Sequence, residues 1–326
     1  MTLLSASLRV DAGVSLPGEG ALQIAVDIIA PENPQPIVLV CLPGGAMNRR
    51  YFDLCAPGDE SYSFARQMAA RGFICVLMDH LGVGESTRPA DGYALTAELL
   101  ARANAQATAT VLKKLGNGSA VPGLAAIPNL TSIGIGHSMG AMLTIVQQAE
   151  FHQHAAIAVL GFSTQGLPDY LPSELKELAR DTVAMRRQAP RFAKAMFREP
   201  YPSIGRSAEG NQLYAGAKAE AAGVEAIKAA RERLLPVPAF ISMLPGNVAP
   251  EAAKIDVPVF VGLGELDMAG PPQDAPKAFT SSPEVTLEIL PGAGHSHFLF
   301  PARQQLFLRL GIWAEHLLSL QSSRQL

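Results

Sequence analysis

A serine flanked by glycines is the first feature of this sequence that could do chemistry. The motif Gly136-His137-Ser138-Met139-Gly140 follows the predicted strand Thr131–Ile135 and opens a predicted amphipathic helix, Met139–Glu150. A strand, a tight turn and a helix in this order make a serine hydroxyl project from the sheet, and glycines relieve crowding around the strained backbone. The motif therefore predicts Ser138 as a nucleophile, with an ordinary turn serine as the alternative.

A serine hydroxyl needs a base at neutral pH, and two histidines near the end of the chain could supply it. His295 closes the glycine-rich segment 290–295, directly after an apolar run that predicts a strand. Because glycines let the loop bring the ring across the strand ends, we expect His295 to be the base. His297 is the alternative, although we expect a residue two positions further on to point in a different direction.

The base itself must be oriented by an acid, which should follow another strand. Asp267 comes shortly after the apolar run Val257–Val261. A carboxylate there would fix the tautomer of the imidazole and stabilise its protonated form. We expect Asp267 in this role, with Glu265 or an aspartate that merely caps the loop as alternatives. The chain order of serine, acid and histidine is the one expected for a nucleophile on a strand–turn–helix elbow.

Acyl transfer also needs hydrogen-bond donors for the oxyanion. The backbone N–H of Met139, directly after the nucleophile, is one candidate. The segment Pro43-Gly44-Gly45-Ala46 follows the apolar run Ile37–Leu42 and could bring main-chain amides close to a substrate. We expect Gly45 to provide the second donor, with Ala46 as the next choice and a plain turn as the alternative.

The elements that must position these residues alternate along most of the chain, which predicts a mostly parallel α/β sheet with helices on both faces. Strands are expected at 21–30, 37–42, 73–78, 131–135, 155–160, 257–261 and 285–290, and helices at 61–71, 95–115, 139–150 and 302–320. From about 163 to 250 the pattern is helical without a convincing strand. We therefore expect one α/β core, formed by 1–162 and 251–326, that carries 163–250 as an insertion.

Composition excludes several classes of protein. A net charge of −3 and a pI near 6.2 argue against nucleic-acid binding, and no apolar run approaches a membrane span. The start of the chain carries no recognisable secretory signal, so we expect a cytoplasmic protein.

Cys41 and Cys75 are expected to be buried thiols, and His152 and His154 to be exposed. Neither a metal site nor a cofactor is expected, because no Cys/His cluster or His-Glu-x-x-His motif occurs.

The elbow and the three candidate residues resemble the α/β-hydrolase superfamily over nearly the whole chain outside the insertion. The segment 78–86 resembles the Asp-x-Arg-Gly-x-Gly-x-Ser loop of that family, and 43–50 resembles its His-Gly-Gly-Gly oxyanion loop. Pro43 stands where histidine is usual, and His80 where arginine is usual. These departures concern the subfamily rather than the chemistry. In the first of these loops we expect Asp79 and Ser86 to have structural roles.

In this family the residues between the sixth and seventh strands form a cap, which implies that 163–250 is a helical cap or lid. Its apolar side chains could roof a hydrophobic pocket or simply pack cap helices onto the core. For the pocket we select Ala46 from the oxyanion loop and Met196, Phe197 and Met243 from the cap. The basic residues of the cap, such as Arg186 and Arg187, are expected on a solvated helix face, with contact to an anionic substrate as the alternative.

The function predicted from these observations is a serine hydrolase that cleaves a carboxylic ester or lactone through an acyl-enzyme on Ser138. Its partner would be a small-molecule substrate, predominantly apolar and small to medium-sized. The sequence leaves open whether the chain forms a homodimer. A C–C bond hydrolase or thioesterase could use the same triad, and a hydrolase-like receptor or lyase with little turnover is the alternative of another class. A dinucleotide-binding oxidoreductase is disfavoured, because Met139 replaces the third glycine of the Gly134-x-Gly136 pattern.

Overall fold

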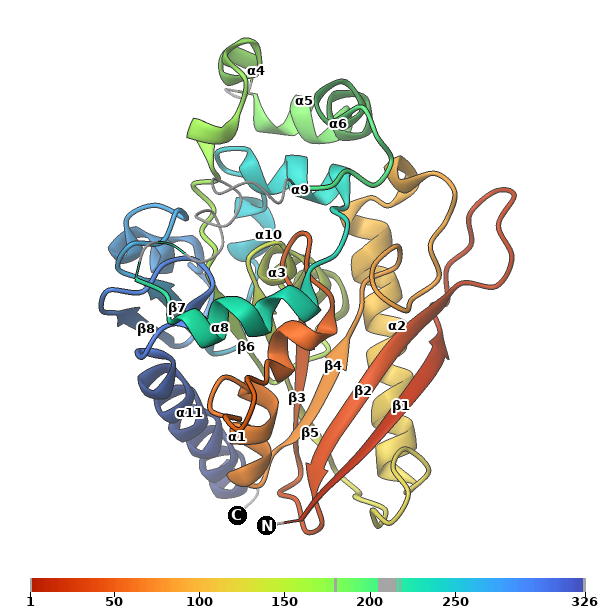
Figure 1. Cartoon of the computed structure of the whole chain (residues 1–326), viewed down its shortest axis with the longest axis vertical. Helices are drawn as coiled ribbons and strands as arrows, with labels where there is room; N and C mark the ends of the chain where they lie inside the picture. The colour runs from red at the N-terminus through yellow and green to blue at the C-terminus, as the bar shows by residue number, and fades with distance from the viewer. Residues whose placement is uncertain (1, 179–180, 205–215, 217, 325–326) are drawn as a thin grey trace.

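One mixed sheet forms the centre of the molecule (Figure 1). The computed structural model describes residues 2–178, 181–204, 216 and 218–324. Its strands are β1 (Leu3–Asp11), β2 (Gln23–Pro31), β3 (Ile37–Leu42), β4 (Ile74–Met78), β5 (Thr131–His137), β6 (Ala156–Leu160), β7 (Val259–Gly264) and β8 (Val285–Leu290). They lie in the order β1-β2-β4-β3-β5-β6-β7-β8. The strands from β4 to β8 in that order pair in parallel, whereas β1–β2 and β2–β4 are antiparallel.

Helices of the described residues cover both faces of this sheet. They are α1 (Phe64–Ala70), α2 (Ala97–Gly116), α3 (Met139–Phe151), α4 (Ser173–Leu178), α5 (Thr182–Arg187), α6 (Ala189–Phe197), α8 (Ala221–Ala226), α9 (Pro236–Met243), α10 (Ala249–Ala252) and α11 (Arg303–Arg324). Short 3-10 helices that matter below are η1 (Arg49–Asp53), η4 (Ile227–Ala230) and η6 (His297–Leu299). The long helices α2 and α3 contact each other on one face, and α1 and α11 contact each other on the other.

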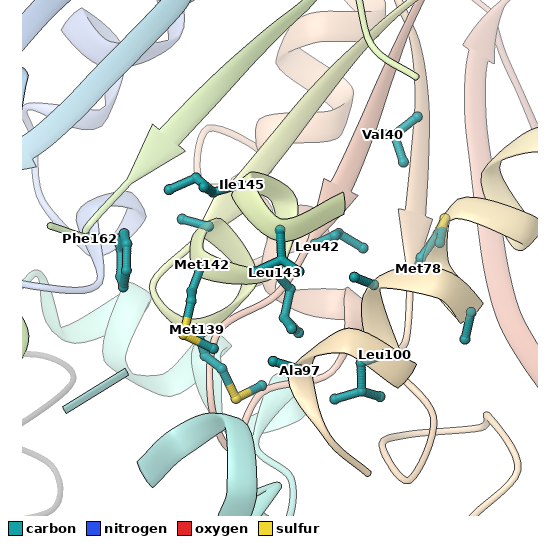
Figure 2. Close-up of a cluster of buried hydrophobic side chains, with 14 of the residues drawn as sticks. Val40, Leu42, Met78, Ala97, Leu100, Met139, Met142, Leu143, Ile145 and Phe162 are labelled. Carbon is teal, nitrogen blue, oxygen red and sulfur yellow. The ribbon is translucent and has the colours of Figure 1, made fainter. Parts of the chain in front are cut away.

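Two apolar clusters, one on each face, hold the sheet between its helices. Every residue of the five strands β3 to β7 is buried except Thr131, as the near-continuous apolar runs predict for strands covered on both sides. Figure 2 shows part of the first cluster, where Leu143 of α3 lies among Leu42 of β3 and Leu100 of α2. The elbow helix α3 is therefore fixed between the sheet and α2.

The sequence misses one strand and misplaces the start of another. β1 lies at an edge of the sheet, where its residues alternate between exposed and half-buried, so it lacks the apolar run that marks the inner strands. β7 begins at Val259 rather than Val257, because Pro258 has no N–H to donate to the ladder. The other predicted strands and helices are confirmed to within a few residues.

Between β6 and β7 the described residues form helices and no strand, which confirms the helical character predicted for 163–250. Helices α4, α5, α6 and α9 lie together above the sheet in Figure 1. The division into core and cap stays a prediction. Among the described residues, no helix is both long and apolar enough to cross a membrane.

The expectation that His154 is exposed is wrong, whereas His152 is exposed as predicted. His154 follows α3, and its ring lies between Ser132 Oγ, 3.1 Å from Nδ1, and Gln147 Nε2, 3.3 Å from Nε2. Gln148 accepts from its backbone N–H and donates to its carbonyl. The polar residues beside His154 are typical of a surface turn in the sequence. In the structure they form hydrogen bonds with the ring and the backbone of this buried histidine. Burial lowers the pKa of His154 from 6.5 to about 4.

This lowered pKa predicts a loss of stability in mild acid. Below about pH 6.5 the unfolded chain binds a proton at His154 that the folded chain does not bind until about pH 4, so stability falls as the pH falls through this window. Between pH 7.5 and 5, the free energy of unfolding of the native chain should decrease by about 2 kcal/mol more than that of His154→Gln. Urea unfolding at both pH values measures the difference. Equal decreases in the two proteins would contradict the assignment.

Candidate active site

Ser138 occupies a strained turn between β5 and α3. Its backbone has φ 54° and ψ −123°, a conformation that residues other than glycine rarely adopt. The flanking glycines are required for space: a Cβ on Gly136 would lie 2.4 Å from Ala141 Cα, and one on Gly140 would lie 2.2 Å from the Leu42 carbonyl oxygen. The sequence motif thus forms the tight elbow that it predicts.

Three strand ends bring the predicted nucleophile, base and acid together. Ser138 directly follows β5, Asp267 lies beyond β7, and His295 lies beyond β8. Ser138 Oγ is 2.9 Å from His295 Nε2, and His295 Nδ1 is 2.8 Å from Asp267 Oδ1. This is the geometry in which an imidazole can take a proton from the serine while a carboxylate fixes its tautomer.

Asp267 is a buried carboxylate that stays ionised. Its side chain is fully excluded from solvent. Burial alone would raise its pKa, but the charges and hydrogen bonds of His295 and His297 outweigh this effect and hold the pKa well below its usual value. A charged acid is the form that can orient His295 and stabilise an imidazolium.

His297 does not point away from the site, contrary to the expectation from its position in sequence. Its Nε2 lies 2.9 Å from Asp267 Oδ2, so both histidines reach the same carboxylate. The alternative acid, Glu265, is exposed and accepts a hydrogen bond from the N–H of Gly292 instead. No pattern in the sequence indicated the His297 contact, because it depends on the tight turn that begins η6.

His137, inside the elbow motif, packs beside it as predicted. Its Nε2 is 2.9 Å from the carbonyl oxygen of His295, and its ring stacks on Tyr51 of η1 with centroids 4.5 Å apart. Burial and the neighbouring His295 and His297 lower the pKa of His137 well below its usual value. A neutral His137 can therefore donate to the His295 carbonyl and hold the backbone of the base.

The loop 43–46 lies against the elbow. A Cβ on Gly44 would be 3.1 Å from Ser138 Cβ, and one on Gly45 would be 3.9 Å from Met139 Cβ. Met139 is the first residue of α3, where helix geometry leaves the backbone N–H without a partner inside the helix. Ala46, the alternative to Gly45, has a positive φ of 55° and accepts a hydrogen bond at its carbonyl from Glu232 N–H.

His80, which stands where the family usually has arginine, supports this loop. Its Nε2 is 3.0 Å from the Pro43 carbonyl oxygen, and its Nδ1 is 3.2 Å from Asn104 Nδ2. Burial lowers the pKa of His80 despite both hydrogen bonds. Because the Asn104 amide donates to Nδ1, the proton of the neutral ring resides on Nε2 and points at Pro43.

An ion-pair network around the buried Arg49 joins η1, which follows this loop, to the end of β4. The Arg49 guanidinium contacts Asp79 at 2.5 Å, Asp27 at 2.6 Å and Glu85 at 2.8 Å. Burial raises the pKa of Asp79, and the N–H groups and charge of Arg49 offset part of this rise. Ser86 Oγ donates to the Asp79 carbonyl and accepts from Ala25 N–H. These contacts match the structural roles expected for Asp79 and Ser86.

A small cavity of about 10 Å³ lies beside Ser138 and His295. This is about the space that one water molecule needs. Its lining comes from the segment after β6, from α9 and from the β7 loop, and comprises Ser138, Gly161, Phe162, Ser163, Gly166, Leu167, Ser242, Ala269 and His295. Ser138 itself is half-buried, and the free space beside it is small.

None of the four residues selected for the pocket is among those that line this cavity, and their role stays a prediction. Ala46 is buried, whereas Met196, Phe197 and Met243 are half-buried and pack against the first apolar cluster. Arg186, expected on a solvated face, is half-buried and pairs with Glu251 at 2.8 Å, whereas Arg187 is exposed as expected. In the described part of the chain, no group of three His, Cys, Asp or Glu side chains is arranged to hold a metal ion.

Comparisons with known proteins identify the family. The model of the "Alpha/beta hydrolase family" matches residues 39–304. No protein of curated function matches the sequence. Among solved structures, the chain is similar to a thermophilic esterase from Thermogutta terrifontis, with TM-score 0.57 and 18% identity over 95% of this chain and 99% of the other. It is also similar to a Paleococcus ferrophilus monoacylglycerol lipase, with TM-score 0.60 and 16% identity over 97% and 100% of the two chains. A third is the peroxisomal alpha-beta-hydrolase Lpx1 from Saccharomyces cerevisiae, with TM-score 0.59 and 12% identity over 98% and 90%.

The ion-pair network predicts unequal effects of two neighbouring substitutions. Arg49→Met leaves Asp79 buried without its cation, so it should lower the free energy of unfolding by about 3–5 kcal/mol. Arg50→Met removes only an exposed side chain with one 3.7 Å ion pair and should change it by less than about 0.5 kcal/mol. Urea unfolding of both variants checks this. Similar costs for the two would refute a structural role for the network.

Proposed function

This chain belongs to the alpha/beta hydrolase family, and we propose that it is a serine hydrolase that cleaves a carboxylic ester or lactone through an acyl-enzyme. The observation that carries the proposal is the continuous line of hydrogen bonds from Ser138 Oγ through His295 to Asp267. The esterase and the lipase with a similar fold are consistent with it, but at their low identity they support the fold alone.

The proposed reaction follows from the roles that this geometry allows. His295 Nε2 takes the proton of Ser138 Oγ as the oxygen attacks the substrate carbonyl carbon. The N–H groups of Met139 and Gly45 stabilise the tetrahedral oxyanion. His295 then protonates the leaving alkoxide, which leaves an acyl group on Ser138. Water, deprotonated by the same histidine, releases the acid and restores the serine.

Lactones and esters differ only in whether the alcohol and acid products stay joined, so the same steps serve both. A thioesterase or C–C bond hydrolase would use the same residues, and no contact in the described structure favours either over an ester. Turnover of simple esters separates the hydrolase from a receptor or lyase with an intact triad. We keep the ester or lactone as the proposed substrate class.

We further propose that residues 163–250 act as a cap and that the acyl part of the substrate is small and apolar. The cavity beside Ser138 is lined mostly by Gly161, Gly166, Ala269, Phe162 and Leu167, and it has little free space. An acyl group larger than this space would require side chains of the segment after β6 to turn aside. A short acyl group needs the smallest such movement.

Ser138→Ala tests the nucleophile. This variant should lose nearly all hydrolysis of a p-nitrophenyl ester panel, about 10³-fold or more in kcat, because no other group can form the acyl-enzyme. Its unfolding curve should stay close to that of the native chain. Ser203→Ala, at an exposed serine, is the matched control and should keep full activity. Native-like turnover by Ser138→Ala would overturn the assignment.

Leu167→Ala tests the size of the acyl site. Removing this half-buried side chain from the cavity wall should raise kcat/KM for p-nitrophenyl butyrate relative to acetate by about 30-fold, since each of the two additional methylenes contributes on the order of 1 kcal/mol. Leu308→Ala, at an exposed position of α11, is the control. An unchanged acyl-length preference in Leu167→Ala would show that the acyl group binds elsewhere.

A further inference from the structure

Both oxygens of the Asp267 carboxylate are hydrogen-bonded, each in a different way. Oδ1 lies 2.8 Å from His295 Nδ1 and accepts from the N–H of Ala269 at 3.1 Å. Oδ2 lies 2.9 Å from His297 Nε2, which is its hydrogen-bond partner among the described residues. The side chains of Asp267 and His297 are fully buried. Without His297, Oδ2 would be a buried, charged oxygen with no hydrogen-bond donor among the described residues.

The surroundings of His297 indicate which of its nitrogens carries the proton. Nε2 faces Asp267 Oδ2 and is also 3.2 Å from the backbone N of Gly264. One nitrogen cannot donate to the carboxylate and accept from Gly264 at once, and a hydrogen bond to an ionised oxygen is the stronger of the two. Nδ1 is buried without a partner in the described residues. A bare acceptor costs less there than an orphaned N–H, so the proton belongs on Nε2.

The backbone explains how two histidines spaced by one residue reach one carboxylate. His297 N–H donates to the His295 carbonyl at 3.1 Å, in a tight turn where η6 begins. The same carbonyl lies 2.9 Å from His137 Nε2. This turn places both imidazoles on the side of Asp267. The base and its acid are thus fixed relative to each other from two directions.

We propose that His297 is a positioning residue: by donating from Nε2 to Oδ2, it fixes the rotation of the Asp267 carboxylate and withdraws part of its negative charge. The inference rests on the proposed hydrolase function. Asp267 follows the exposed residues Glu265 and Leu266 in the loop after β7, so the loop itself does not bury the carboxylate on every side. His297 supplies the contact that keeps Oδ1 aimed at His295 throughout the reaction.

Two variants of similar size separate hydrogen bonding from packing. His297→Gln keeps an N–H donor at about the position of Nε2, whereas His297→Met fills a similar volume without a donor. In His297→Met, kcat should fall by up to about 100-fold, as a misplaced reacting group costs that much, while KM for the p-nitrophenyl ester changes little. His297→Gln should recover most of this loss.

The pH profile gives a readout that lost packing would not change. In His297→Met, Asp267 lacks the donor to Oδ2, so more of its negative charge acts on His295. This charge stabilises the His295 imidazolium, and the acidic limb of the pH profile of kcat/KM should therefore move to higher pH. In His297→Gln the limb should stay near its native position. The other titratable groups around His297 are His137, His295 and Tyr51, and both variants retain them. Equal kcat losses and equal pH profiles in the two variants would overturn the proposal.

A measurement on the resting protein separates this proposal from the proposed function. In a spectrum of the chain labelled with ¹⁵N-histidine, the signals of His297 are identified by their disappearance in His297→Gln. We expect His297 to carry its proton on Nε2. An Nδ1-protonated ring would overturn the proposal even in an active enzyme. If no ester is hydrolysed but the Nε2 tautomer is found, the hydrogen bond stands and the hydrolase function fails.

Discussion

The backbone of Ser138 is the constraint on which the rest of the structure depends. A non-glycine residue at φ 54° and ψ −123° costs free energy, and it persists only where the surroundings determine it fully. Its N–H donates to the Leu160 carbonyl at 2.7 Å, and its carbonyl accepts from Ala141 and Met142 at the start of α3. The elbow is thus tied to β6 on one side and to α3 on the other, and packing against α2 prevents α3 from moving.

Around this elbow, buried polar groups make a rigid frame rather than a flexible site. His80 and Arg49 hold the loop 43–50 from the end of β4, and His137 holds the backbone of His295. These hydrogen bonds and ion pairs join buried polar groups, so the loss of one partner would leave the other group unsatisfied. Such networks specify a single arrangement. This explains how a serine, a histidine and a carboxylate from three separate loops meet at distances near 2.9 Å.

The inner strands and the elbow could be predicted from sequence because their signals are local. A short strand followed by the glycine-flanked serine motif marks β5 and Ser138. Parallel strands with their carboxyl ends at one edge bring Asp267 and His295 to the same place. The contacts of His154, Arg49 and His297 could not be predicted, because each depends on which distant residues fold against it. β1 was missed because an edge strand with one half-exposed face carries no continuous apolar run.

Reaction of the native chain with a fluorophosphonate, followed by mass spectrometry of its peptides, tests the central claim most directly. Phosphonylation requires an activated serine but no particular acyl group, so it probes the site independently of substrate. We expect one adduct, on Ser138, because His295 lies 2.9 Å from its Oγ and can take its proton. An adduct on another serine would contradict Ser138 as the nucleophile. So would the absence of any adduct when the folded protein is treated with a fluorophosphonate small enough to enter the site.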